Sequence, residues 1–299
     1  MEKVIFFGNG LNRLVSSNIS WGDLLDKIKN QNKFDDDKLP NTMIYERIVL
    51  QKLNTNEDIL QDEFELKVDI AELLRDIKGN EVYKNLFELD CQHYITTNYD
   101  YGFIDSIIGL KDINLPISEH STEDVYSVRR LKSISTKKEK KKHFWQIHGE
   151  IRRPATIMLG LDQYSGSISK LNDYVKGNYK YQRDGVSITE ASIEDKLNDN
   201  KLNESSWAEL FFGSDIHIMG FSFDFSEMDL WWLLTRRARM KKSPRTKSLI
   251  KNSIHFYCHE IDDQKKALFE SLDISVHVLK LGTSGDKYIK HYENIIKMI

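Results

Sequence analysis

The sequence predicts an α/β fold: a Rossmann-like, doubly wound and mostly parallel sheet with helical insertions. Short runs of apolar and β-branched residues recur along the chain, and segments with helical spacing separate them, as expected of strands joined by crossover helices. The first run, residues 4–7, leads directly into a glycine-bearing loop. Small or polar residues follow several later runs, where the carboxyl ends of parallel strands would meet.

Composition and charge exclude several classes of protein. Of the 299 residues, 40% are hydrophobic and 30% are charged, as in a soluble globular domain. The formal charge of −3 gives no global basic field for nucleic acid. Cys91 and Cys258 are too few for a disulfide framework or a four-cysteine zinc site. No run approaches the roughly 20 apolar residues of a membrane span. We therefore expect a cytoplasmic protein with one domain over residues 1–299.

Seven apolar runs predict the strands. In chain order they are residues 4–7, 91–95, 144–147, 155–159, 215–219, 254–258 and 274–281. Helical spacing predicts helices from Asp100 to about Gly109, over residues 228–234 and over residues 263–272. This alternation is the pattern of a parallel sheet.

Two longer segments interrupt the alternation, at about residues 21–88 and 162–206, and we expect both to be helical insertions. In the first, apolar residues follow helical spacing around an acidic, polar connector at residues 32–40. The second has few large apolar residues. A helical or irregular segment is expected there, and a lid over a site is one interpretation.

Small or polar residues follow four of the predicted strands, at residues 8–13, 96–100, 148–149 and 220–224. In an open parallel sheet, ligands bind outside the carboxyl ends of the strands, so four such ends predict a shared cleft. Taken alone, residues 96–100 are equally consistent with an Asn-Tyr-Asp turn that caps the next helix. Residues 8–13, similarly, could form a plain turn before a helix.

These motifs, in this order, resemble the sirtuin-like superfamily, specifically its bacterial NAD-hydrolase branch in anti-phage defence and the related H-type abortive-infection proteins. The matching residues are Gly8-Asn9-Gly10-Leu11-Asn12, Trp21 with Leu24-Leu25, Thr96-Thr97-Asn98-Tyr99-Asp100, Ile147-His148-Gly149, Gly220-Phe221-Ser222 and Asp229-Leu230-Trp231-Trp232. Protein-deacylating sirtuins have a glycine-alanine-glycine-serine loop and paired zinc-binding cysteines, and this chain has neither. The resemblance therefore implies cleavage of NAD itself.

The resemblance implies an NAD+ hydrolase (NAD glycohydrolase) that releases nicotinamide and ADP-ribose, with NAD as substrate and no cofactor. His93, His217, His255 and His277 show no metal-ligand spacing, so we assign no metal. In NAD the nicotinamide ring is cationic and leaves as a neutral molecule, so the reaction needs a held ribose and a placed water more than acid assistance. Asn98 would orient this water or hold the ribose, and Asp100 would contact the nicotinamide amide. His148 would bond a ribose hydroxyl and act as general base, which its near-neutral ordinary pKa allows.

Nucleotide binding is expected from residues at the same strand ends: Gly8, Asn9, Gly10, Asn12, Arg13, Thr97, Gly220 and Ser222. The N–H groups around Gly8 and Gly10 would meet the pyrophosphate, and Ser222 would add a hydroxyl near the nucleotide. Arg13 is either a phosphate partner or a charge on a helix surface.

Constant NAD hydrolysis would be toxic, so a gate is expected: a homo-oligomer, a partner protein of the defence system or a nucleotide signal. Two rival hypotheses are a non-catalytic subunit that binds NAD or ADP-ribose, and a defence component that acts on nucleic acid. The second would use residues 236–247, which hold seven Lys or Arg and no acid. A solvated helix end is the alternative there, and the basic residues 129–143 are expected in a solvated loop or hairpin.

Overall fold

The computed structural model describes residues 1–299 except 30–33, 35–38, 53–58, 111–112, 121–122, 124, 137–140 and 184. Its helices and strands, in chain order, are β1 (Lys3–Phe7), η1 (Asn12–Leu14), α1 (Trp21–Lys29), α2 (Asn41–Lys52), α3 (Ile59–Leu73), α4 (Glu81–Glu88), β2 (His93–Thr96), α5 (Gly102–Ile107), β3 (Ile113–His120), β4 (Leu131–Thr136), β5 (Lys141–Gln146), η2 (Pro154–Thr156), α6 (Leu161–Lys176), β6 (Lys180–Arg183), β7 (Val186–Thr189), α7 (Ile193–Asn198), α8 (Trp207–Gly213), β8 (Asp215–Met219), α9 (Met228–Lys242), β9 (Ile254–Cys258), α10 (Asp263–Ser271), β10 (Ile274–Val278) and α11 (Lys287–Met298).

The main sheet has eight strands in the order β10-β9-β8-β1-β2-β5-β4-β3. The strands from β10 to β5 are mutually parallel, whereas β4 runs antiparallel to β5 and β3 antiparallel to β4. Numbered in chain order, the parallel strands β1, β2, β5, β8, β9 and β10 lie in the 3-2-1-4-5-6 order of a Rossmann sheet. The predicted α/β fold is confirmed. The strand order reverses between β1 and β8, where such sheets bind their ligands.

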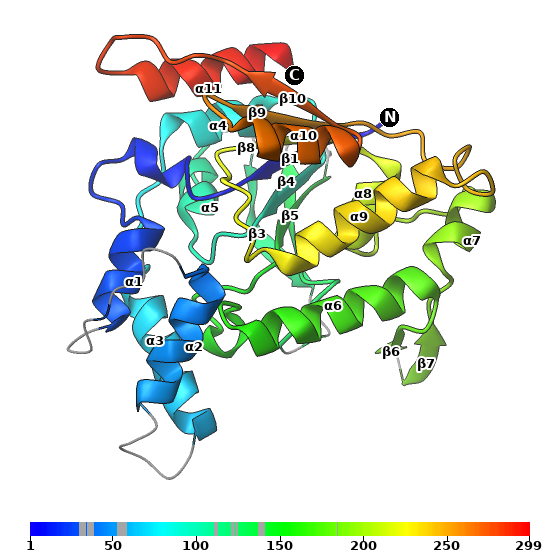
Figure 1. The fold of residues 1–299 in the computed structure, drawn as a ribbon, viewed down its shortest axis with the longest axis horizontal. Helices are drawn as coiled ribbons and strands as arrows, with labels where there is room; N and C mark the ends of the chain where they lie inside the picture. Colours follow the sequence, from blue (N-terminus) through cyan, green and yellow to red (C-terminus); the bar gives the residue numbers. More distant parts are fainter. Residues whose placement is uncertain are drawn as a thin grey trace.

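Helices cover both faces of this sheet (Figure 1). Alternate residues of β1 point to opposite faces, as the strand period requires. Val4 and Phe6 pack into a core with α6, α8 and α9, whereas Ile5 and Phe7 pack into a second core with α4, α5 and α11. Both faces are thereby buried, and the strand ends are left to form the surface at the switch point.

Helices α1, α2 and α3 form an arm at the lower left of Figure 1. The arm has its own core, formed by residues of all three helices and by Leu74, which follows α3. The helical residues are Leu24, Leu25, Ile28, Ile44, Tyr45, Ile48, Leu66 and Ile70. Trp21, at the start of α1, meets the ring of Tyr99 edge to face at 5.4 Å, which joins the arm to the end of β2.

Six of the seven predicted strands are present, and the prediction for residues 155–159 is wrong. Pro154 begins the short helix η2 there. The apolar residues that follow do not enter the sheet, because Ile157 and Leu159 pack into the core of the arm. The second proposed insertion contains α6, the β6–β7 hairpin and α7, and α6 packs against α9.

The basic segments make internal contacts. Part of residues 129–143 forms the antiparallel pair β4–β5, where Lys142 is buried and donates to the Leu89 carbonyl (2.8 Å). Lys137, Lys138 and Lys140 lie outside the described residues. In the tail of α9, Arg237 is fully buried, and neighbouring Lys241 pairs with Asp273 (2.6 Å). Within the described part of the chain, no helix combines the length and apolarity needed to cross a membrane.

Candidate functional site

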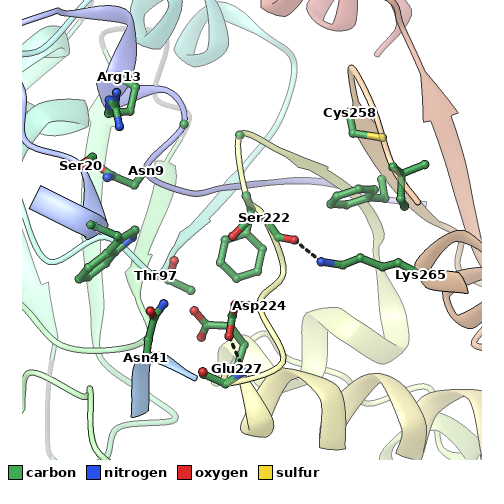
Figure 2. Close-up of a pocket in the computed structure, with 18 of the residues that line it drawn as sticks. Asn9, Arg13, Ser20, Asn41, Thr97, Ser222, Asp224, Glu227, Cys258 and Lys265 are labelled. Carbon is green, nitrogen blue, oxygen red and sulfur yellow. Dashed lines mark hydrogen bonds between the residues drawn. The ribbon is translucent and has the colours of Figure 1, made fainter. Parts of the chain in front are cut away.

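A cavity of about 920 Å³ lies between the loops that follow β1 and β8, at the switch point of the sheet. Such a volume is typical of pockets for small molecules and cofactors. One wall comes from the β1 loop and the first residues of α1 and α2, including Asn9, Arg13 and Asn41. Ser222, in the loop after β8, and Lys265, in α10, stand on the opposite side (Figure 2).

Glycines let the β1 and β8 loops touch through their backbones. The N–H of Gly10 donates to the Gly220 carbonyl (2.8 Å), and the N–H of Gly8 donates to the Met219 carbonyl (3.3 Å). A Cβ atom on Gly10 would lie 2.7 Å from the Gly220 carbonyl oxygen, so a larger residue would separate the loops. Both N–H groups are therefore engaged, and they are not available to a pyrophosphate in this arrangement.

Asn12 and Asp100 form a buried network next to the cavity. Asn12 Nδ2 donates to Asp100 Oδ2 (2.8 Å) and Asn9 Oδ1 (2.9 Å), and Asn12 Oδ1 accepts from the Tyr83 hydroxyl (2.8 Å). Asp100 Oδ1 accepts from the N–H of Gly102, the first residue of α5 (2.8 Å). Burial raises the pKa of Asp100, although these hydrogen bonds oppose the shift. Asp100 thus joins the β1 loop to the start of α5, as the helix-capping interpretation anticipates.

The buried side chain of Asn98 interacts with the Tyr83 hydroxyl but makes no hydrogen bond of normal geometry to the described residues. The residue is 4% exposed, and its backbone N–H is held by Thr96 Oγ1 (3.1 Å). Neither Oδ1 nor Nδ2 has a hydrogen-bond partner of normal geometry among the described residues. Asn98 lines a second pocket of about 10 Å³ with Trp21 and Tyr99, which is room for about one water. An unpartnered buried amide costs free energy, which points to contact with a ligand.

His148 lies between two carboxylates. Its Nε2 is 3.2 Å from Asp229 Oδ2, and its Nδ1 is 3.4 Å from Glu227 Oε2. The Ser167 hydroxyl donates to Asp229 (2.9 Å), and the Tyr164 hydroxyl donates to Glu227 (2.9 Å). The strand end after β5 therefore supplies the ring, and α6 and the start of α9 supply the groups that hold it.

The two carboxylates change the acidity of this cluster. Burial lowers the pKa of His148, but the charges of Asp229 and Glu227 outweigh burial, so the pKa of His148 is raised above its ordinary value. Burial raises the pKa of Glu227 to about 7, against the opposing effect of His148. A proton can thus be shared between His148 and Glu227 near neutral pH.

Among the described residues, two groups of side chains are close enough to hold a metal ion: His148 with Glu227 and Asp229, and His93 with Glu2 and Glu204. Ring chemistry weighs against both. Each nitrogen of His148 faces a carboxylate, which favours a proton on each. His93 Nδ1 accepts from the Trp145 indole (3.1 Å), so its proton sits on Nε2, facing Glu204 (2.8 Å). Metal ligation needs an unprotonated nitrogen, and we assign no metal to either group.

Other polar atoms along the main cavity also lack partners. Ser226 Oγ and His291 Nδ1 are buried with no hydrogen-bond partner in the described structure, and both residues line the cavity. Lys265 Nζ, in α10, donates to the Ser222 carbonyl in the loop after β8 (2.7 Å; Figure 2). Burial lowers the pKa of Lys265. The cavity therefore offers several unused donors and acceptors to a polar ligand.

The structure brings the predicted site residues to one region. Those that line the main cavity are Asn9, Gly10, Arg13, Thr97, His148, Gly220 and Ser222. Asn98 and Asp100 line the smaller pocket, which Asn9 shares. Gly8 and Asn12 lie directly behind, in the contacts described above.

Sequence reasoning missed Glu227 as a site residue and noted Asp229 only as part of a motif. Both residues lie within a few positions of the strand end at residues 220–224, and this proximity is the feature of the sequence that could have indicated them. With 46 acidic residues in the chain, residue type alone could not select them. Their partner, His148, lies about 80 positions away, as the separation from Asp229 shows.

Comparison with known proteins gives two findings. A family model described as a SIR2-like domain matches residues 92–276, more than half of the chain. The NAD(+) hydrolase ThsA of Bacillus cereus (strain MSX-D12) is 28% identical over 177 residues, which cover 58% of this chain and 33% of that protein. The chain thus spans about a third of the length of the curated relative that it matches. The resemblance to the sirtuin-like family is confirmed.

Proposed function

The chain belongs to the SIR2-like domain family, and we propose that it is an NAD+ hydrolase that cleaves NAD to nicotinamide and ADP-ribose. Two findings support the proposal. The Rossmann order of the parallel strands places a cavity at the switch point, where dinucleotides bind in this class of sheet. The similar Bacillus cereus protein is named an NAD(+) hydrolase, which favours hydrolysis over protein deacylation.

The unpartnered amide of Asn98 carries the proposal. Folding does not explain this amide, because it makes no side-chain hydrogen bond of normal geometry to the described residues. A ribose hydroxyl or the attacking water would satisfy it. We assign Asn98 this role, and we place the ribose near His148, which lines the main cavity.

The reaction breaks the bond between ribose C1′ and the nicotinamide nitrogen. The electron pair of the bond goes to the nitrogen, so nicotinamide leaves neutral, and a water oxygen then bonds to C1′. The transition state has oxocarbenium character, and the negative charge at Glu227 and Asp229 would stabilise it. The rest of NAD would be held by cavity residues, with Arg13 near phosphate and Ser222 near the nucleotide.

We further propose that the activity is gated and serves anti-phage defence by depleting NAD. The support is the toxicity of constant NAD hydrolysis together with the family resemblance. A homo-oligomer or a partner protein would supply the gate. Cellular NAD should then fall during phage challenge in cells that carry the wild-type protein. A level NAD pool in cells that are still protected would contradict this role.

The direct test measures nicotinamide release from NAD by purified wild-type protein, Asn98→Ala and His148→Ala. We expect turnover by the wild type and a loss of about 100-fold or more in both variants, as for removal of a group that acts in the transition state. Asn294→Ala, at an exposed position of α11, is the matched control and should keep wild-type turnover. Wild-type rates in Asn98→Ala would contradict the assignment of the site.

A further inference from the structure

The carboxyl group of Glu227 lies next to His148, and both residues line the main cavity. Glu227 Oε2 is 3.4 Å from His148 Nδ1 and accepts from the Tyr164 hydroxyl at 2.9 Å. Among the described residues, no hydrogen bond reaches Oε1 of Glu227. Its side chain is 18% exposed and lines the cavity, whereas the side chain of His148 is 2% exposed. Glu227 is therefore the more accessible proton acceptor of the two.

His148 is poorly placed to take a proton from water. A general base needs an unprotonated atom directed at the water molecule. The two nitrogens of His148 are directed at Asp229 and Glu227, and these carboxylates favour a proton on each. The Ser167 hydroxyl fixes Asp229 in turn, so the ring has little freedom to turn away. His148 is thus arranged as a hydrogen-bond donor.

We propose that Glu227 is the general base of the reaction, and that His148, held by Asp229, positions the Glu227 carboxyl group by facing its Oε2 atom. This inference rests on the proposed NAD+ hydrolase function. As the C1′–nitrogen bond breaks, nicotinamide leaves with the electron pair, and the water oxygen bonds to C1′. Glu227 Oε1 takes one proton of that water. NAD and water thereby give nicotinamide, ADP-ribose and a proton on Glu227, which is later released to solvent.

The pH dependence follows from the groups that face Glu227, which come from four segments: α6, α9 and the loops after β5 and β8. Burial raises the pKa of Glu227 to about 7; His148 lowers it, Asp229 raises it, the hydrogen bond from Tyr164 lowers it, and Asp224 raises it. A general base acts only when it is deprotonated. The value of kcat/KM should therefore rise about tenfold per pH unit below about pH 7 and level off above it.

The test compares wild-type protein, Glu227→Gln and Glu227→Asp over this pH range. Glu227→Gln keeps the shape of the side chain, and we expect it to lower kcat by about 10²–10⁴-fold and to abolish the acidic limb of the profile. Its Kd for NAD, measured by calorimetry, should stay within about threefold of the wild-type value. Glu270→Gln, on the exposed side of α10, is the matched control and should leave the profile unchanged.

The outcomes separate this inference from the proposed function. Glu227→Gln turnover within about threefold of wild type, with the acidic limb retained, would overturn the role of Glu227 while leaving NAD hydrolysis established. Absence of wild-type turnover at every pH, together with a level NAD pool in cells that are protected during phage challenge, would overturn the proposed function and this inference with it. Glu227→Asp keeps a carboxylate, so it should retain the acidic limb at a reduced kcat even if Glu227→Gln fails to fold. Loss of that limb in a folded Glu227→Asp protein would also overturn the role.

Discussion

Two buried asparagines differ in what their side chains contact. Asn252 is fully buried, and its Nδ2 donates to the carbonyls of Phe211 (3.0 Å) and Ser214 (2.8 Å). Its Oδ1 accepts from Arg237 Nε (3.0 Å). Asn98 is buried to a similar degree, yet its amide has no such partners in the described structure. The first amide stabilises the fold, and the second is available to a ligand.

This contrast predicts that the same substitution to alanine lowers stability strongly at Asn252 and only slightly, if at all, at Asn98. Asn252→Ala removes three hydrogen bonds and leaves buried groups unpaired, so it should lower the free energy of unfolding by about 2–4 kcal/mol. Asn98→Ala removes two polar atoms that lack partners, so it should change that free energy by less than about 1 kcal/mol. Urea unfolding of both variants beside the wild type measures the difference. An equal loss in both would show that Asn98 is a structural residue.

At this scale, the sequence could identify residues whose type is unusual at their position. Asn98 and His148 directly follow apolar strands, so their polarity is informative. Glu227 and Asp229 lie in a segment where acids are ordinary, and their role depends on a histidine brought near by folding. The hydrogen bonds of the Gly8 and Gly10 N–H groups were also beyond prediction, since their acceptors are the last residue of β8 and the first residue after it.

Helix α9 links the site to the far edge of the sheet. Asp229 lies in its first turn, and Arg237, two turns later, is fully buried. Arg237 Nη2 donates to the Asn252 carbonyl (2.6 Å), and its guanidinium lies 3.5 Å from Asp273. The sequence suggested either a solvated end or a docking surface for this basic segment. Arg237 instead contacts Asn252 and Asp273, and these contacts could not be foreseen because both residues lie on other segments of the chain.

Arg237→Ala should therefore act on stability. It removes the Nη2 donor to the Asn252 carbonyl and the Nε donor to Asn252 Oδ1 and opens a cavity beside α9. We therefore expect a loss of about 2–4 kcal/mol in the free energy of unfolding. Arg239→Ala, at an exposed position of the same helix, should change it by less than about 0.5 kcal/mol. Chemical denaturation of the two variants tests this. Comparable stabilities would show that the buried contacts of Arg237 contribute little.

For the whole molecule, the parallel part of the sheet was predictable and its antiparallel extension was not. The central strands are apolar because both of their faces are buried, and this leaves a clear signal in the sequence. Strands β3 and β4 are rich in polar residues and lie beyond β5 at one edge. Residues 155–159 carried the apolar signal of a strand, yet they pack against the arm. An apolar run predicts that a segment is buried, but it does not predict which core the segment packs into.

At the other side of the sheet, histidines from three strands lie next to one another. The ring centroids of His217 (β8) and His255 (β9) are 5.0 Å apart, and those of His255 and His277 (β10) are 5.3 Å apart. His217 is 7% exposed, and its Nδ1 is 3.0 Å from the Tyr257 hydroxyl. Burial lowers the pKa of His217 to about 4, and the neighbouring rings add to the effect.

This cluster predicts that acid destabilises the fold. The unfolded chain binds a proton at His217 with a pKa of about 6.5, whereas the folded protein binds it only near 4. Between these values the unfolded state holds more protons, so the free energy of unfolding falls as pH drops from about 6.5 to 4. His217 should account for a loss of about 2–3 kcal/mol between pH 7.5 and 4.5. His217→Phe should reduce the pH-dependent loss by that amount in urea unfolding at the two pH values, because other titrating groups affect both proteins alike. An equal pH-dependent loss of unfolding free energy in the variant and the wild type would show that protonation of His217 does not destabilise the folded protein.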